Sequence, residues 1–376
     1  MRGKIISNIA ILLLAIDVTL NDLNFYYINF FNYILLFITI LLIFENAFIF
    51  LKKELYIYVL SIIIFLFFYV AKLVVNAHLE DVFAFNIPIL FKYLLYFMLG
   101  VKFFDINKNV LLISIIIIFI GFFNLLNVNT LSIDFFKLHN PYERSVLASS
   151  ADILVVVYFI FLLKERKKRI KNIFQLSITA LILFFLFIGG SRTTFILFLV
   201  SYLLVFGVKF KYIFIFGLTL VVLINDQFIE IISNIERLKD YRVLKLLSYK
   251  EDTSYIARNK LFDSGLNDIL ENPLLGKFGG QLTSSITDAT GRRWGGYIHN
   301  ILSYYRQFGL IPFILLVNLL VHSTNKLVKT NKKFIPILLF LLISILFSRS
   351  YSFPFVFIII GVTISFQLNN NKYFYK

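Results

Sequence analysis

Long apolar runs alternate with short polar segments over most of the chain. Each run is close to 20 residues long, the length that an α-helix needs to cross the roughly 30 Å hydrocarbon core of a bilayer. This spacing predicts an all-α polytopic membrane protein whose single membrane domain spans residues 1–376. We expect about twelve transmembrane helices, at residues 5–22, 28–50, 55–75, 86–101, 109–128, 146–163, 172–190, 193–208, 212–228, 298–321, 334–348 and 353–368.

The basic residues fall in alternate connections between these runs. Cytoplasmic loops of membrane proteins are enriched in Lys and Arg. A cytoplasmic N-terminus and C-terminus place the most basic connections inside, at Lys52–Lys53, Lys102, Lys108, Lys164–Lys171, Lys209–Lys211, Lys326–Lys333 and Lys372–Lys376. The opposite connections then face outward.

One connection, residues 225–297, is far longer than the others and falls on the outer face by this count. Connections of this length usually carry function. Within it, Tyr255–Leu270 has apolar residues at spacings near 3.6, which predicts a short amphipathic helix that lies on the membrane or caps the bundle. Asn272–Gly280 then ends this helix with proline and glycine.

Composition agrees with a membrane protein and narrows the chemistry. Hydrophobic residues make up 59% of the chain, more than a soluble core of this length needs. The absence of cysteine excludes disulfides, thiolate nucleophiles and thiolate metal sites. The net charge of +16 follows the topology, so membrane lipids are expected partners and nucleic acid is not.

His299 follows two glycines, Gly295-Gly296, and stands at the mouth of the predicted helix 298–321. An ionisable side chain within the membrane costs free energy, so its presence at the start of a membrane helix suggests a function. Free backbone N–H groups at a helix start disfavour imidazolium, so a neutral histidine is suited to act as a general base. The alternative is an interfacial histidine that anchors the helix.

Ser303 and Arg306 share a helix face with His299 at i+4 and i+7 and are candidates for substrate binding. A guanidinium within a membrane helix needs a partner or a water-filled cavity. Arg306 therefore either contacts substrate or forms a structural ion pair with an acid such as Asp152 or Glu45.

Arg192 follows Gly189-Gly190-Ser191 and opens the predicted helix 193–208 on the outer face. A helix start binds anions, and a guanidinium adds a bidentate fork for phosphate. The alternative is a simple interfacial arginine.

Three further arginines fall on the outer side. Arg258 lies on the amphipathic loop helix, from which it could reach the site of Arg192 and His299. The alternative is that it belongs to a solvated face of that helix. Arg144 and Arg349 lie near the outer ends of predicted helices and are weaker candidates for binding an acidic lipid head group.

The sequence has no pattern typical of a metal or nucleotide site. It contains no His-x-x-x-His and no cysteine, and it has neither a Walker A sequence nor a Gly-x-Ser-x-Gly. We therefore expect no metal and no cofactor. Several arginines and one histidine on the outer face are suited to hold a lipid-linked diphosphate, stabilise its charge as it leaves, and take a proton from an attacking hydroxyl.

Three stretches within residues 180–320 resemble the bacterial O-antigen polymerase and O-antigen ligase superfamily of integral membrane glycosyltransferases. They are Gly189-Gly190-Ser191-Arg192, then Arg258 followed by Asp268–Gly276, and His299-Asn300 followed by Gly309-Leu310. The resemblance implies a helical bundle of the GT-C type and metal-independent transfer at the periplasmic or outer face of the bacterial inner membrane. It also implies that Arg192 and Arg258 bind undecaprenyl diphosphate, and that His299 activates or orients the acceptor.

Three functions remain open at this point. The leading one is a polymerase of O-antigen or capsular polysaccharide that transfers a glycan from undecaprenyl diphosphate to a lipid-linked repeat unit. A ligase that transfers glycan to lipid A-core is the nearest alternative, and a lipid-linked oligosaccharide flippase is the alternative from another class. The first two imply a lipid-linked oligosaccharide donor and a glycan acceptor as partners, with a chain-length regulator protein as a further partner of the polymerase.

Overall fold

The computed structural model describes residues 2–22, 28–50, 52, 55–76, 78, 80–127, 132–133, 141–164, 173–189, 191–205, 253–280, 298 and 300–373. Most of these residues are helical. Two strands of two residues each, β1 (Leu126–Asn127) and β2 (Ser132–Ile133), follow the helix Lys108–Leu125. They pair antiparallel, with Leu126 opposite Ile133. The all-α class predicted from the sequence is thus confirmed for the described chain.

Each predicted apolar run overlaps one or two helices, apart from 212–228, which lies outside the described residues. The helices are α1 (Arg2–Asp22), α2 (Ile28–Phe50), α3 (Tyr56–Val75), α4 (Glu80–Val101), η2 (Phe103–Asp105), α5 (Lys108–Leu125), α6 (Pro141–Lys164), α7 (Ile173–Ile188), α8 (Arg192–Val205), α11 (Thr253–Glu271), α13 (Leu302–Phe308), α14 (Leu310–Thr330), η6 (Lys332–Phe334), α15 (Ile335–Phe347) and α16 (Val356–Tyr373). The predicted amphipathic helix Tyr255–Leu270 is α11.

The prediction of about twelve membrane spans is wrong in number. In the described part of the chain, four helices are long and apolar enough to cross a membrane by length and composition: α3, residues Val82–Val101 of α4, α5 and α14. Some of the other apolar runs form shorter helices. The 13 residues of α15 extend only about 20 Å at 1.5 Å per residue. Four spanning helices still indicate a multi-pass membrane protein.

The predicted helix 298–321 is broken into two. α13 begins at Leu302, so the expectation that His299 opens this helix is corrected, and His299 itself lies outside the described residues. The break falls at Gly309, whose φ of 83° and ψ of −176° belong to a region that essentially only glycine adopts. α14 then runs on to Thr330, nine residues past the predicted end.

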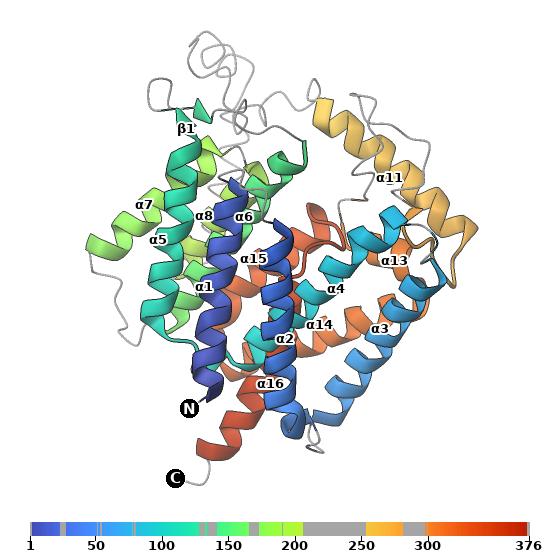
Figure 1. The fold of residues 1–376 in the computed structure, drawn as a ribbon, viewed down its shortest axis with the longest axis horizontal. Coiled ribbons are helices and arrows are strands. Elements are labelled where there is room, and N and C mark those ends of the chain that lie inside the picture. Colours follow the sequence, from blue (N-terminus) through green and yellow to red (C-terminus); the bar gives the residue numbers. More distant parts are fainter. Residues whose placement is uncertain are drawn as a thin grey trace.

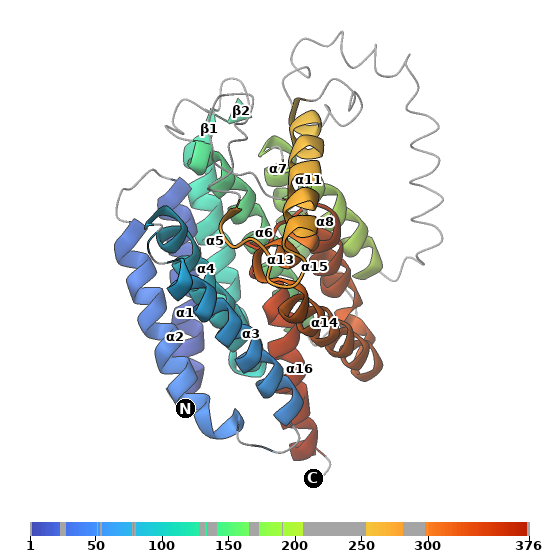
Figure 2. The same ribbon diagram turned by 90° about the vertical axis from the view of Figure 1, so that its right-hand side faces the viewer.

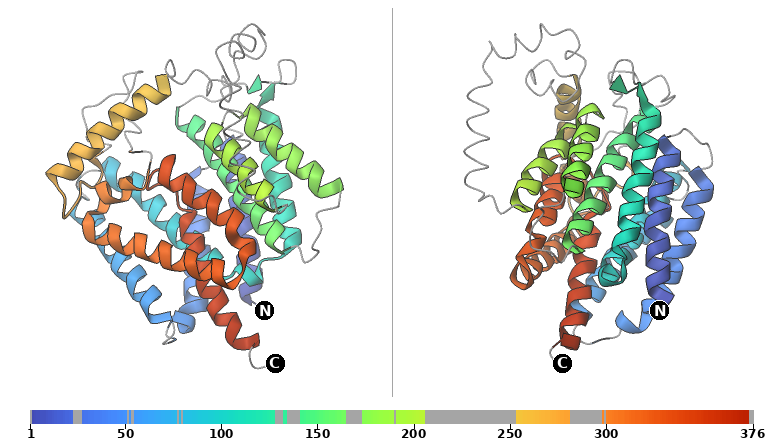
Figure 3. Two further views of the ribbon diagram at one scale, coloured as in Figure 1. Left: turned by 180° about the vertical axis from the view of Figure 1, so that it is seen from behind. Right: turned by 90° about the vertical axis from the view of Figure 1, so that its left-hand side faces the viewer.

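The helices form a bundle with distinct ends (Figure 1). Both termini lie at one end, and α11 and the β1–β2 pair lie at the opposite end (Figures 1 and 2). α1 runs between α2 and α5, while α3 and α14 cross the bundle obliquely (Figures 1 and 3). α4 and α16 meet in backbone contact, because a Cβ on Gly361 would lie 2.1 Å from the carbonyl oxygen of Phe97.

Candidate functional site

The predicted site residues differ in how much of each the structure describes. Arg306, Ser303 and Arg349 are described with their side chains. Arg192, Arg258 and Arg144 are placed only through the backbones of α8, α11 and α6, and His299 lies wholly outside the described residues. The predicted catalytic roles of His299, Arg192 and Arg258 therefore stay predictions, and the geometry around them is what the structure adds.

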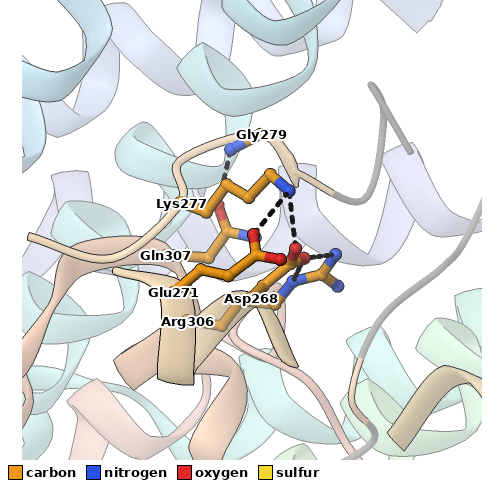
Figure 4. Close-up of polar contacts among 6 residues, drawn as sticks. All are labelled: Asp268, Glu271, Lys277, Gly279, Arg306 and Gln307. Carbon is orange, nitrogen blue, oxygen red and sulfur yellow. Dashed lines mark hydrogen bonds and ion pairs between the residues drawn. The ribbon is translucent and has the colours of Figure 1, made fainter. Parts of the chain in front are cut away.

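Arg306 lies in an ion-pair cluster that we call the Asp268 cluster, made of the buried Asp268 and Arg306 and the more exposed Glu271 and Lys277 (Figure 4). Arg306 donates through Nε to Asp268 Oδ2 at 2.8 Å, and its Nη2 bonds the same oxygen. Lys277 Nζ donates to the other oxygen, Oδ1, at 2.6 Å and lies 3.8 Å from Glu271. The carboxylate of Asp268 in α11 thus binds two cations, Arg306 of α13 and Lys277 of the turn that follows α11.

Arg306 has an acid partner, as the structural alternative expected, although the acid differs from those named. The partner is Asp268, not Asp152 or Glu45. Asp152 bonds Arg349, and Glu45 lies 3.9 Å from Lys102. Because the Arg306 side chain is only 2% exposed, its main contribution is to fasten α13 to α11. Direct contact of Arg306 with substrate stays a prediction.

Backbone hydrogen bonds fasten the turn after α11 to the break between α13 and α14. Leu310 N donates to Leu274 O at 3.1 Å, and Lys277 N donates to Arg306 O at 2.6 Å. These bonds satisfy backbone groups where α13 ends and α14 begins, which would otherwise need solvent. The turn therefore closes over the helix break.

Glycines make this close approach possible. Gly276 has a φ of 68°, and a Cβ at this position would lie 2.6 Å from Gly309 N and 2.7 Å from Arg306 O. Gly279 also has a positive φ, and its N–H donates to the side-chain Oε1 of Gln307 at 2.9 Å (Figure 4). The glycine punctuation noted in the sequence is thus a requirement of the contact as well as a helix stop.

The residues on either side of His299 are held in place. Ile298 is fully buried and packs against Gly265 of α11, where a Cβ would lie 2.2 Å from its Cγ1. Asn300 accepts a hydrogen bond from Leu302 N at 2.9 Å through its side chain, and its carbonyl accepts one from the Ser303 hydroxyl at 2.7 Å. The hydroxyl of buried Ser303 therefore helps to shape the entry to α13, and its predicted contact with substrate stays a prediction.

A second group, the Asp152 cluster, consists of Asp152, Ser191, Thr194 and Arg349. Arg349 Nε lies 2.9 Å from Asp152 Oδ2, and its Nη2 donates to Asp152 Oδ1 at 2.9 Å and to Thr194 Oγ1 at 2.8 Å. Thr194 in turn donates to Asp152 at 2.8 Å and accepts from Ser191 at 2.8 Å. Ser191 and Thr194 flank Arg192, so the cluster fixes the start of α8 where Arg192 lies.

The turn between α15 and α16 contacts both the Asp152 cluster and α13, the helix that carries Arg306. Arg349 of this turn belongs to the Asp152 cluster, and Tyr351 follows two residues later, within about 7 Å along the backbone. The Tyr351 ring packs edge-on against Tyr304 and Phe308 of α13, with centroids 6.5 and 6.0 Å apart. The start of α8 and the helix that follows His299 thus lie on either side of one short turn.

Sequence reasoning missed Asp268, Lys277 and the pairing of Asp152 with Arg349. A signal for Asp268 was present. It lies on the same face of α11 as Gly265 and Ile269, so it is a carboxylate on the buried face of an amphipathic helix. A buried carboxylate requires a cation. The sequence alone therefore contained enough information to pair Asp268 with Arg306, which needed an acid partner.

The fold and these clusters define a helical, multi-pass membrane protein with two ion-pair clusters near the α11 end of the bundle. No model of a known protein family matches the chain, and no curated protein matches it. The resemblance to the O-antigen polymerase and ligase superfamily accordingly supports a proposal and does not establish membership.

Proposed function

We propose that the protein is a membrane glycosyltransferase that polymerises a polysaccharide, such as O-antigen or capsule, from lipid-linked repeat units. The observation that carries the proposal is the fastening of α11, the helix with Arg258, to the chain on both sides of His299. Gly265 packs on Ile298 before this histidine, and Asp268 bonds Arg306 after it. Two residues that the resemblance assigns to one reaction are thus carried by segments that contact each other.

The third predicted catalytic residue, Arg192, lies at the start of α8, which the Asp152 cluster holds in place. Arg349 and Thr194 hold the start of α8, and Tyr351 of the same turn packs on α13. The side chain of Arg349 is 21% exposed. A cation with this access is suited to a diphosphate or an acidic lipid head group, and Arg144 is a further candidate for that role.

The proposed reaction is a displacement at the anomeric carbon of the donor glycan. The hydroxyl oxygen of the acceptor sugar attacks this carbon as its bond to the undecaprenyl diphosphate oxygen breaks. His299 takes the proton from the hydroxyl, and the diphosphate leaves with the electron pair of the broken bond. Arg192 and Arg258 stabilise the charge that develops on the diphosphate.

The proposal places both termini in the cytoplasm and the site at the outer face of the bacterial inner membrane. Two connections predicted to be cytoplasmic lie near each other through Phe103. Lys164 Nζ lies 5.0 Å from the Phe103 ring centroid, and the Phe103 ring lies 5.6 Å from that of Phe334, which follows Lys332-Lys333. This supports one basic, cytoplasmic end, opposite α11.

Loss-of-function variants test the proposal in the host strain that lacks the gene. Complementation with His299→Ala or Arg192→Ala is expected to abolish polymer, because each variant removes a group that acts on the reacting atoms. The protein should still insert and fold. His322→Ala is the matched control, since His322 is an exposed histidine of α14, and it should support normal polymer.

The same strain separates the alternatives. A surface glycan that stops at one repeat unit supports a polymerase. Complete loss of attached glycan, with lipid-linked polymer accumulating, supports a ligase in its place. Normal polymer in both the His299→Ala and the Arg192→Ala strain would overturn glycosyl transfer altogether. A flippase predicts instead that repeat units accumulate on the cytoplasmic side.

A further inference from the structure

The free face of α11 changes character along its length. Asn259, Asp263 and Asn267 lie on one face of the helix at spacings of four residues, and all three are exposed. Leu270 continues this face into the last turn and is 76% exposed. The face thus has a polar zone at Asn259, Asp263 and Asn267, and an apolar zone begins at Leu270, beside Glu271, which is 64% exposed.

The apolar zone extends into the turn after α11. Leu274 and Leu275 are 67% and 65% exposed. The opposite face of α11 already packs on the bundle through Gly265, Asp268 and Ile269, which are buried. These three exposed leucines, which we call the leucine patch, are thus outside that packing, and the exposed residues 271–273 lie between them in the chain. Exposed large apolar side chains that gather in one region mark an interaction site.

The leucine patch continues onto a helix that is suited to span the membrane. Leu274 O accepts a hydrogen bond from Leu310 N, the first residue of α14. The first turns of α14 expose Ile311 and Ile314, and α14 is long and apolar enough to cross a bilayer. The exposed side chains of such a helix contact acyl chains. The leucines therefore extend a surface whose partner is lipid.

The orientation of α11 fits this continuity. In Figure 1, α11 slopes from the outer end of the molecule, where it begins, down to α13 and the end of α3, where it finishes. Its last turn thus lies deeper than its first. Glu271 and Lys277, beside the leucines, are partly exposed, as charged side chains are at the boundary between acyl chains and head groups.

We infer that Leu270, Leu274 and Leu275 insert into the acyl chains of the bilayer leaflet at the α11 end, while Asn259, Asp263 and Asn267 stay in water. α11 both caps the bundle and enters the membrane, with the boundary in its last turn, where Glu271 lies beside Leu270. The partner of this surface is the lipid bilayer. The inference goes beyond the proposed function, because it holds whatever reaction the site performs.

Fluorescence from single tryptophans tests the inference on the full chain. The sequence has one tryptophan, Trp294, so Trp294→Phe provides a background without tryptophan. Leu274→Trp is added in one variant and Asn259→Trp in a matched control on the polar zone of the same face. Both proteins are reconstituted in phosphatidylcholine vesicles with ordinary or brominated acyl chains, and elution volume and circular dichroism confirm the fold.

The Leu274→Trp protein is expected to emit at shorter wavelength and to lose most of its emission in brominated vesicles. The Asn259→Trp protein should keep its emission there and be quenched by aqueous acrylamide. Equal acrylamide quenching of the two proteins, with no effect of bromine, would overturn the inference. Shielding of Leu274→Trp from both quenchers would also overturn it, since protein, such as a second copy of the chain, would then cover the patch. Leu270→Trp replaces Leu274→Trp if that variant does not fold.

Discussion

The two ion-pair clusters use the same residue types and differ in access to water. Each joins a buried aspartate of one helix to an arginine distant in sequence, 38 residues apart in Asp268–Arg306 and 197 apart in Asp152–Arg349. The side chain of Arg306 is 2% exposed and that of Arg349 is 21% exposed. In the Asp268 cluster Lys277 adds a second cation, whereas in the Asp152 cluster the hydroxyl of Thr194 completes the bonding.

This difference separates a structural role from a functional candidate. A fully buried guanidinium has its charge committed to its carboxylate, so Arg306 serves to hold α11 on α13. An arginine whose side chain is partly exposed is easier for an anion to approach than one that is fully buried. Of the arginines with described side chains that we predicted to bind substrate, Arg349 is therefore the better placed, and it lies beside the start of α8 that carries Arg192.

The largest expected effect is that of Asp268→Ala. This change leaves the buried Arg306 charge without its carboxylate, and breaking a buried pair by removing one partner costs about 3–5 kcal/mol. Thermal unfolding of the purified protein in detergent measures the loss. Asp263→Ala is the matched control, because Asp263 is an exposed aspartate of the same helix and its loss should change stability by no more than about 0.5 kcal/mol. Equal stability of the two variants would refute a fastening role for the Asp268 cluster.

Gly309→Ala tests the same fastening through the backbone. Alanine at a φ of 83° and ψ of −176° is strained by about 1–3 kcal/mol, and its Cβ would lie 2.2 Å from Leu274 O. We expect lower thermal stability and faster proteolysis between α11 and α13. Gly309→Asn should fare no better, because this region excludes asparagine as well. Stability equal to that of the wild type would mean that the break between α13 and α14 does not require glycine.

Asp152→Asn probes the more open cluster. Asparagine keeps the shape of the side chain but loses the charge, and hydrogen bonds to a charged group contribute about 1.5–3 kcal/mol. Arg349 can be partly hydrated, so the stability loss should be smaller than in Asp268→Ala. Relative to its small loss of stability, Asp152→Asn should lose more polymer in the complemented strain than Asp268→Ala does. The reason is that the start of α8, which carries Arg192, is held by the Asp152 cluster. A stability loss as great as that of Asp268→Ala would erase the distinction between the clusters.

The smallest effect is expected for Lys277→Ala. The Lys277 side chain is 41% exposed, and ion pairs of exposed groups contribute only about 0–1 kcal/mol. The small difference from wild type should shrink further in high salt, which screens exposed charges. Unfolding in low and high sodium chloride measures this. A large loss that persists in high salt would show that Lys277 is as essential to the Asp268 cluster as Arg306.

The positions of the helices were largely predictable from the sequence. The predicted run 28–50 is α2, and the run 172–190 contains α7 (Ile173–Ile188). Such boundaries depend on apolar length and on nearby polar or glycine residues, all within one segment. The number of spans was less predictable. It depends on how much of an apolar run is helical, and α15, for example, ends after 13 residues.

The candidate site was predictable in kind and unpredictable in detail. A guanidinium at position 306 requires a counter-charge, so an acid partner was a sound expectation. Asp152 and Glu45 were the wrong acids, because both were chosen as charges within apolar runs. Asp268 reaches Arg306 only because the turn at Gly276 folds α11 back over α13.

The sequence by itself determined the class of this protein. Apolar runs of membrane-helix length, basic residues in alternate connections and one amphipathic segment before His299 are local properties, set by residues close together in the chain. The tertiary structure alone decided the partners of Arg306 and Arg349, the break at Gly309, and the position of the α11 leucines beside α14. These depend on the approach of distant segments, where backbone contact, charge compensation and apolar surface must be satisfied together.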